Sequence, residues 1–211
     1  MKDGNRTARP ALIVVNGLSG TGKTGLALRL AGDLALPCVG NDQLKEVIFD
    51  TLGHSDLAWS ERLGVTSSAL LWSVCGSIVC AGSSLVIENH FKADVDAPKL
   101  RDLQVRCRPR IVEIHCYADR EVLVERVQER VATGDRHPGH GEQDDETLHG
   151  TVIPNLKTDR DPLLEAPDLY ILVDTASGDD GETDPPYDAL LTEVRAFLTG
   201  THPESPPVTG G

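Results

Sequence analysis

The sequence has little positive charge. Its 211 residues include 20 Lys plus Arg against 33 Asp plus Glu, which gives a formal net charge of −13. No basic stripe with interleaved aromatic residues offsets this excess. A surface this acidic would repel a nucleic-acid backbone. We therefore expect no nucleic acid among the partners of this protein.

Hydrophobic targeting segments are also lacking. The first ten residues, MKDGNRTARP, contain no apolar core of the kind found in signal peptides. We find no apolar run that approaches membrane-spanning length. The protein is therefore expected to be cytoplasmic, with no membrane partner. Cysteines are few and odd in number, which predicts buried free thiols in a reducing compartment. They are Cys38, Cys75, Cys80, Cys107 and Cys116.

Short apolar segments alternate with helical patterns along the chain. The predicted strands are 11–16, 36–41, 83–89, 110–118 and 168–174, and the predicted helices are 23–34, 43–52, 66–81, 97–104, 119–132 and 186–199. Such an alternation favours an α/β fold, a five-stranded parallel sheet between two layers of helices. One domain is expected over residues 1–200. Within it, the polar and acidic segment 134–150 is predicted to be a mobile lid, and 201–211 a disordered tail.

The segment VVNGLSGTGKTGLAL contains a phosphate-binding pattern. Gly17, Gly22, Lys23 and Thr24 fit G-x-x-x-x-G-K-[ST], with an apolar strand-like run before them and a Leu-rich helical pattern after them. In that context we expect Lys23 to reach the β- and γ-phosphates of a nucleotide and the Thr24 hydroxyl to coordinate Mg²⁺. The residues expected to surround the phosphates are Gly17, Ser19, Gly20, Thr21, Gly22, Lys23 and Thr24.

Acidic residues follow the second and third predicted strands, where an open parallel sheet binds its ligands. Asp42 is our candidate for a general base that accepts the proton of a phosphoryl-acceptor hydroxyl. Alternatively, Asp42 only caps the helix that follows it. Glu88 resembles an acid that holds Mg²⁺ through water. It is equally read as a second substrate-binding carboxylate or as a hydrogen-bonded acid at the end of a strand.

Arginines gather before and within the predicted lid. Arg126 and Arg130 share one helix face, and Arg136 lies in the segment that follows. We expect Arg126 to pair with Glu121, Glu125 or Glu129 on an exposed surface. Arg130, before the lid, and Arg136, within it, are expected to stabilise the transferred phosphoryl group or to stack on adenine.

Two further features near the chain's later half bear on the site. His137 and His140 are not predicted to bind a metal, because Pro138 and Gly139 between them do not hold a helical spacing. Thr175, after the last predicted strand, either contributes backbone groups that read the nucleotide base or simply leads out of the strand.

With these residues in place, the sequence resembles the small-molecule P-loop kinases. These are the AAA-type predicted kinases that include chloramphenicol phosphotransferase and, more remotely, zeta toxins. The resemblance covers roughly residues 11–176 and is carried by GLSGTGKT, GNDQLKEVIF, LVIENHF, HCYADREVLVERVQERVATGDRHPGH and LVDT. It implies that ATP and Mg²⁺ are bound and that Asp42 activates the acceptor hydroxyl. The family often has Asp where this chain has Glu88.

The favoured hypothesis is an ATP-dependent, Mg²⁺-requiring phosphotransferase acting on a hydroxyl of a small molecule, such as an antibiotic, a sugar or a nucleoside-like metabolite. A nucleotide or nucleotide-sugar kinase would need several acceptor-side arginines, whereas residues 43–82 contain only Lys45 and Arg62 as cations. A regulatory or non-catalytic nucleotide-binding protein is the third possibility. The sequence does not identify the acceptor or the oligomeric state.

Overall fold

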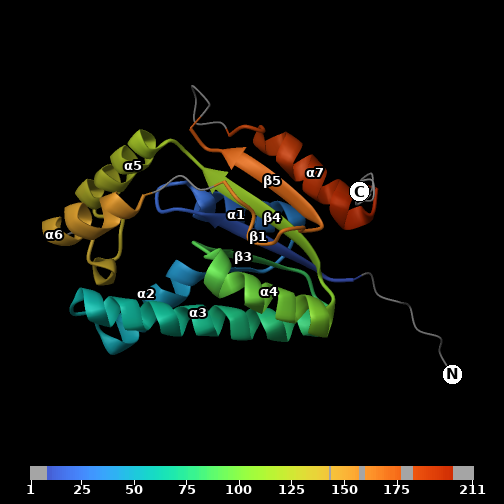
Figure 1. Cartoon of the computed structure of the whole chain (residues 1–211), viewed down its shortest axis with the longest axis horizontal. Coiled ribbons are helices and arrows are strands. Elements are labelled where there is room, and N and C mark those ends of the chain that lie inside the picture. Colours follow the sequence, from blue (N-terminus) through green and yellow to red (C-terminus); the bar gives the residue numbers. More distant parts are fainter. Residues whose placement is uncertain (1–8, 143, 157–159, 177–182, 202–211) are drawn as a thin grey trace.

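A parallel five-stranded sheet forms the centre of the protein (Figure 1). The structure is a computed structural model that describes residues 9–142, 144–156, 160–176 and 183–201. The strand order is β2-β3-β1-β4-β5, and every neighbouring pair is parallel. The strands are β1 (Ala11–Gly17), β2 (Cys38–Gly40), β3 (Leu85–Asn89), β4 (Arg110–Tyr117) and β5 (Leu169–Asp174). The predicted fold class is confirmed.

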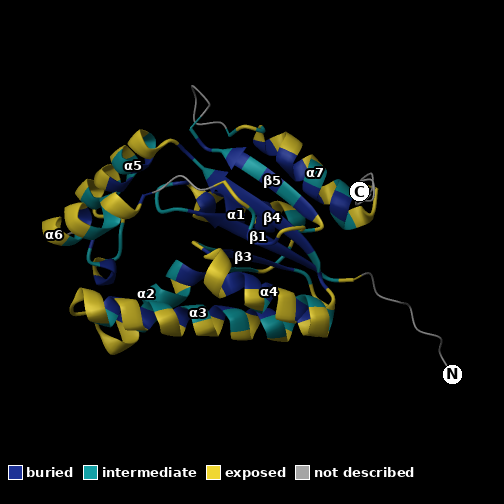
Figure 2. Cartoon of the chain, in the orientation of Figure 1, coloured by how far each residue is buried: buried dark blue, intermediate teal, exposed yellow. Residues whose placement is uncertain are grey.

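Helices cover both faces of this sheet, as Figure 1 shows. On one face α1 (Lys23–Leu34) and α7 (Tyr187–Thr199) contribute to a core with β1, β4 and β5. On the other face α3 (Leu57–Cys80) and α4 (Ala93–Cys107) pack on β1 and β3. Figure 2 shows that the strands are largely buried while the outer sides of these helices are exposed. Both faces of the sheet are therefore buried, which explains the nearly continuous apolar runs in the strand sequences.

The register of the strands brings their carboxyl ends to one edge of the sheet. Gly17 lies beside Cys116, and Gly40 lies beside Glu88. Two helices, α2 (Asn41–Leu52) and α5 (Arg120–Thr133), follow strands directly at this edge. Four short helical turns come after α5: Pro138–His140, α6 (Asp145–Thr147), Leu148–Val152 and Ile153–Asn155. The last two pack on α5 through Leu148, Val152 and Ile153, so the end of the predicted lid is folded.

Helix α3 differs most from the prediction. It begins at Leu57 rather than near residue 66, and the Asp56 side chain caps it by accepting the Trp59 N–H at 2.8 Å. It has 24 residues and contains an 18-residue window with a mean hydropathy of 1.6, so it is long and apolar enough to cross a membrane by length and composition. The expectation that no run reaches that length is therefore wrong. Leu71, Cys75 and Val79 lie on the inner side of the helix, packed into the core beneath the sheet.

Two of the cysteines also depart from the prediction. Cys80 at the end of α3 and Cys107 at the end of α4 form a disulfide with a Cα–Cα distance of 4.8 Å. The expectation of five free thiols is wrong for this pair, because the sequence does not show that two helices separated by a strand end side by side. Cys38, Cys75 and Cys116 are free, and burial raises the pKa of the Cys75 thiol to about 12. Of the tail predicted at 201–211, all but the first residue lies outside the described residues.

Candidate active site

The loop between β1 and α1 has the shape that its glycines predict. A Cβ at Gly17 would lie 2.5 Å from the carbonyl oxygen of Cys116, so only glycine fits beside β4. Gly22 adopts a left-handed conformation with φ of 70° immediately before α1. The first turn of α1 contains no acidic residue, which leaves its N–H groups and its positive dipole end available to an anion. The loop therefore has the geometry that phosphate binding requires, at the carboxyl edge of the central strand.

Lys23, Thr24 and Glu88 meet below this loop. The Lys23 ammonium lies 3.3 Å from the Leu18 carbonyl oxygen and 3.6 Å from Oε1 of Glu88. Burial raises the pKa of Glu88, whose side chain is almost fully enclosed, and the Lys23 ammonium and Thr24 hydroxyl partly offset this rise. A carboxylate and a hydroxyl are oxygen ligands of the kind that Mg²⁺ prefers. Thr24 and Glu88 therefore fit a magnesium site in the chemistry of their oxygen atoms, and their role as its ligands stays a prediction.

A cavity of about 580 Å³ opens on the α1 side of the phosphate loop. Arg126 lines one side of this cavity and is held there by three hydrogen bonds. The guanidinium donates hydrogen bonds to the Gly20 carbonyl oxygen at 3.2 Å, to the Thr175 hydroxyl at 3.2 Å and to the Thr175 carbonyl oxygen at 2.7 Å. Other residues around the cavity are Gly22, Gly25, Leu26, Arg29, Thr183, Pro186, Tyr187 and Asp188. A cavity of this size accommodates a nucleoside.

The expectation for Arg126 was therefore wrong. It does not pair with a glutamate on the surface of α5 but joins the phosphate loop to the end of β5. Its position four residues before Arg130, on the same helix face, was the available signal. Thr175 is buried, lines the cavity and donates its hydroxyl proton to the Tyr117 carbonyl oxygen at 3.0 Å. Whether it reads a base stays a prediction.

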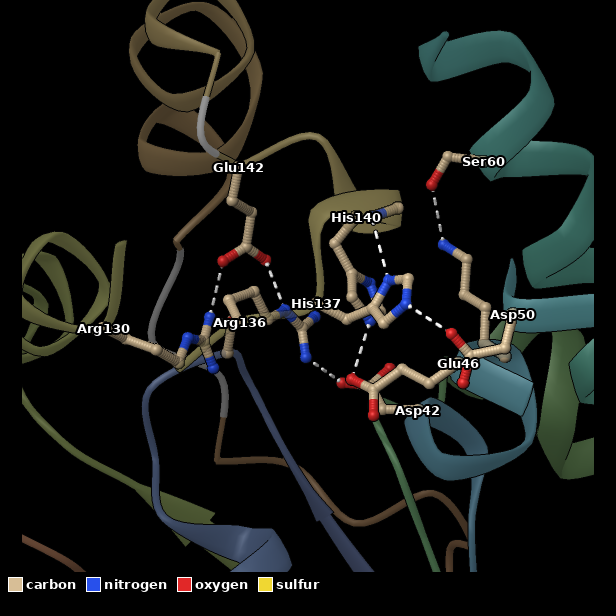
Figure 3. A network of polar contacts seen from close by, with 12 residues as sticks. Asp42, Glu46, Asp50, Ser60, Arg130, Arg136, His137, His140 and Glu142 are labelled. Carbon is tan, nitrogen blue, oxygen red and sulfur yellow. Dashed lines mark hydrogen bonds and ion pairs between the residues drawn. The ribbon is translucent and has the colours of Figure 1, made fainter. Parts of the chain in front are cut away.

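A chain of polar side chains runs from the phosphate loop to α2 (Figure 3). Arg130 donates to the Ser19 hydroxyl at 2.8 Å and pairs with Glu142 at 2.7 Å. The other oxygen of Glu142 pairs with Arg136 at 3.2 Å, and Arg136 pairs with Asp42 at 2.7 Å. Arg130 of α5 and Arg136 of the lid thus lie between the phosphate loop and the predicted base. Glu142, which the sequence reading treated only as one acid of the lid, joins them.

Asp42 lies in the first turn of α2. The capping residue of this helix is Gly40, and no side chain forms a capping hydrogen bond there, so the alternative that Asp42 is only a cap is wrong. Burial favours the neutral carboxyl group, but the Arg136 guanidinium, with smaller contributions from His140 and Lys23, outweighs it and holds the pKa of Asp42 well below its usual range. Asp42 is thus an ionised carboxylate at the carboxyl edge of the sheet.

The lid histidines contact acidic residues of α2. Nε2 of His137 lies 3.2 Å from Asp50, and Nε2 of His140 lies 3.2 Å from Glu46. Within the part of the chain that the structure describes, no group of three or more His, Cys, Asp or Glu side chains is arranged to hold a metal ion.

Known proteins that are similar to this chain include nucleotide-binding domains and kinases. A family model described as "AAA domain" matches residues 12–148. A solved structure from Chloroflexus aurantiacus J-10-fl, described as a "putative kinase", is 35% identical, with a TM-score of 0.78, over 89% of this chain and 98% of that one. No curated protein matches the chain significantly.

Two more distant structures share the fold. Kti12 of Chaetomium thermophilum, in complex with ADP-AlF3, is 16% identical with a TM-score of 0.60, over 89% of this chain and 98% of that chain. The APS kinase of Mycobacterium tuberculosis, in complex with AMPPNP and APS, is 16% identical with a TM-score of 0.53, over 90% of this chain and 98% of that chain.

Proposed function

This chain belongs to the AAA-domain family of P-loop kinase-like proteins, and on that premise we propose that it transfers the γ-phosphate of ATP to a hydroxyl group of a small molecule in a Mg²⁺-dependent reaction. The observation that carries the proposal is the polar chain from Ser19 to Asp42. It sets two arginines between a phosphate-binding loop and an ionised carboxylate.

At the phosphate end, the loop N–H groups and Lys23 would bind the β- and γ-phosphates. Thr24 and Glu88 would hold Mg²⁺, which neutralises charge on the phosphate oxygens when bound. The Lys23 ammonium lies 3.6 Å from Glu88, so the cation and the proposed magnesium ligand are neighbours at this end of the site. Arg126 would bound the nucleoside from the cavity side. These residues account for binding and orientation of the nucleotide.

At the acceptor end, Asp42 would orient the hydroxyl and accept its proton as the new oxygen–phosphorus bond forms. The bond between the γ-phosphorus and the bridging oxygen breaks, and ADP leaves with the electron pair. In the structure Arg136 keeps Asp42 weakly basic. When the γ-phosphate attracts Arg136 instead, the carboxylate loses that partner and becomes a better proton acceptor. Binding of ATP would therefore prepare the base.

An acceptor panel tests this proposal. Purified protein is incubated with ATP, Mg²⁺ and hydroxylated antibiotics, sugars or nucleosides, and ADP release and phosphorylated product are measured. We expect at least one acceptor to stimulate ADP release and to gain a phosphoryl group. The Lys23→Ala variant should lose both signals, because it removes a cation from the transferred phosphate. ADP release that no acceptor changes, with no phosphorylated product, would favour a regulatory nucleotide-binding protein instead.

A further inference from the structure

The lid contacts α2 through one aromatic side chain. Phe49 of α2 is 1% exposed, and the ring of His137 stacks on it with a centroid distance of 5.3 Å and an interplanar angle of 9°. His140 meets the same ring edge-on, also at 5.3 Å. The two histidines therefore enclose Phe49 when the lid lies over the site. Their imidazoles point toward α2 in Figure 3.

Gly139, between the histidines, lies directly against this ring. A Cβ built there would overlap Cγ of Phe49 and would lie 2.8 Å from Cδ1. The backbone of Gly139 is not left-handed, so its conformation is open to any L-residue. The lack of a side chain at this position is thus required by the Phe49 ring and by nothing in the backbone.

Hydrogen bonds hold the same segment in place. Nδ1 of His137 accepts the Gly139 N–H at 2.9 Å, which puts the imidazole proton on Nε2 and makes that nitrogen a donor to Asp50. The N–H groups of His140 and Gly141 donate to carbonyl oxygens at 3.1 and 2.9 Å. Three consecutive amides are therefore protected only while this turn is formed.

We propose that Phe49 is a positioning residue, a seat for the turn 137–140 that holds Arg136 between Asp42 and the phosphate site when the lid closes. Arg136 directly precedes the turn, and its guanidinium lies 2.7 Å from Asp42 while Gly139 lies on the ring. A turn displaced from Phe49 carries Arg136 away from the carboxylate and from the phosphate it would stabilise. The effect on phosphoryl transfer rests on the proposed function, whereas the seating of the lid does not.

Substitution of Gly139 by alanine tests the seat. In the protein without ligands, Gly139→Ala should speed hydrogen exchange of the amides at 139–141 by about tenfold or more, because overpacking a closed contact displaces it. Gly150→Ala is the matched control. Gly150 lies in a later turn, its Cβ would meet nothing within 4 Å, and its backbone is also not left-handed. Unchanged exchange in Gly139→Ala would overturn the proposal.

A double variant distinguishes loss of the specific contact between Gly139 and Phe49 from a general loss of stability. Phe49→Ala removes the ring, and the methyl group of Gly139→Ala then has space, so the double variant should exchange no faster than Phe49→Ala alone. Additive effects of the two changes would mean that they act independently, and the seat would be wrong.

Turnover gives the functional readout. With an acceptor from the panel, Gly139→Ala should retain the affinity of the wild type for an ATP analogue and lose about tenfold or more in kcat. Faster lid exchange with normal kcat would show that the seat does not position Arg136. If the wild type phosphorylates nothing, the proposed function fails, but the exchange comparison still decides whether Phe49 seats the lid.

Discussion

At the residue scale, Asp42 has the ionised form that a general base requires, but its ion pair with Arg136 makes it a weak base. Its carboxylate is ionised and at the edge of the phosphate site, but its partner Arg136 lowers its basicity. Because Arg136 cannot pair equally with Asp42 and with a γ-phosphate, we expect its guanidinium to turn from the carboxylate to the phosphate when a nucleotide binds. The acid–base function proposed for Asp42 would thus depend on which anion Arg136 contacts.

Asp42→Asn removes the base while keeping the size of the side chain. We expect transfer to the acceptor to fall by on the order of a hundredfold or more, the usual range for a positioned acid–base group. ATP affinity should hardly change, because Asp42 does not line the nucleotide cavity, whereas loss of the ion pair with Arg136 should lower the melting temperature. Asp102→Asn, on the exposed surface of α4, is the control for loss of a carboxylate. Normal transfer by Asp42→Asn would exclude Asp42 as the base.

Arg126→Lys tests the wall of the nucleotide cavity. A lysine cannot make the three hydrogen bonds that join the Gly20 and Thr175 carbonyl oxygens and the Thr175 hydroxyl. Calorimetric titration should show nucleotide binding weakened by about tenfold, which corresponds to the loss of one charged hydrogen bond. Arg101→Lys, on the exposed side of α4, should bind as the wild type does. Equal affinity in both variants would mean that Arg126 supports the fold only.

At the residue scale, the sequence predicts which side chains lie together where a motif fixes their positions in the fold. Lys23, Thr24 and Glu88 come together because the loop and two neighbouring strand ends place them, and those positions follow from spacing. Arg126 and Glu142 were missed for one physical reason. Their partners lie 49 and 12 residues away in the sequence, and only the packing of α5 against the sheet brings those partners within reach.

At the scale of elements, the segment after the lid is attached to β4 by a buried carboxyl group. Glu113 is fully buried, and its Oε1 accepts the Leu163 N–H at 2.6 Å. Burial raises the pKa of Glu113 to about 7, although the backbone N–H groups of Leu163 and Leu164 act in the opposite direction. The strand thus carries a group that changes its charge near neutral pH while it anchors the segment.

The stability of the fold should therefore depend on pH through Glu113. Its pKa is raised on folding, so between pH 4.5 and 7 the folded protein binds a proton that the unfolded chain releases, and stability falls as the pH rises through that window. The loss should reach up to about 3 kcal/mol by pH 8. Glu113→Gln keeps an acceptor for Leu163 and should flatten this slope in denaturant titrations at pH 5 and pH 8. Equal slopes in the two proteins would refute the assignment.

The ends of a helix were predictable where its apolar pattern begins next to a recognisable capping residue. Helix α1 has the predicted bounds because the phosphate loop ends at Gly22. The start of α3 was missed because Glu61, Arg62 and Gly64 interrupt its apolar pattern, whereas in the structure Lys45 of α2 donates to Ser60 at 3.0 Å and holds that first part. Such a contact between helices leaves no mark in a local pattern.

On the scale of the whole molecule, the disulfide between α3 and α4 ties together the layer beneath the sheet. It closes a loop of 27 residues, and loss of such a cross-link costs about 3–4 kcal/mol of stability in the chain-entropy treatment. We expect Cys80→Ser to lower the free energy of unfolding by about this amount, whereas Cys38→Ser, at a free thiol, should not. Thiol titration of the denatured, unreduced protein should find three reactive groups. Five would contradict the disulfide.

The fold class of the whole molecule was predictable from the alternation of strands and helices, because each buried strand must be covered by helices on both faces. The strand order was not. It depends on which buried faces match, and the apolar strands resemble one another too closely for their sequences to rank the pairings.

The inner face of α3 has a consequence for the order in which the chain is made. The residues that cover it mostly come later: Leu85, Ile87, Leu100, Leu103 and Ile111. At synthesis rates of about 5–20 residues per second, the ribosome takes a few seconds to add them. During those seconds the nascent chain carries a finished 24-residue apolar helix with most of its partners still unmade. Exposed apolar surface of this kind makes incompletely folded chains prone to aggregation, so we expect the yield of folded protein to fall when translation slows through β3 and α4.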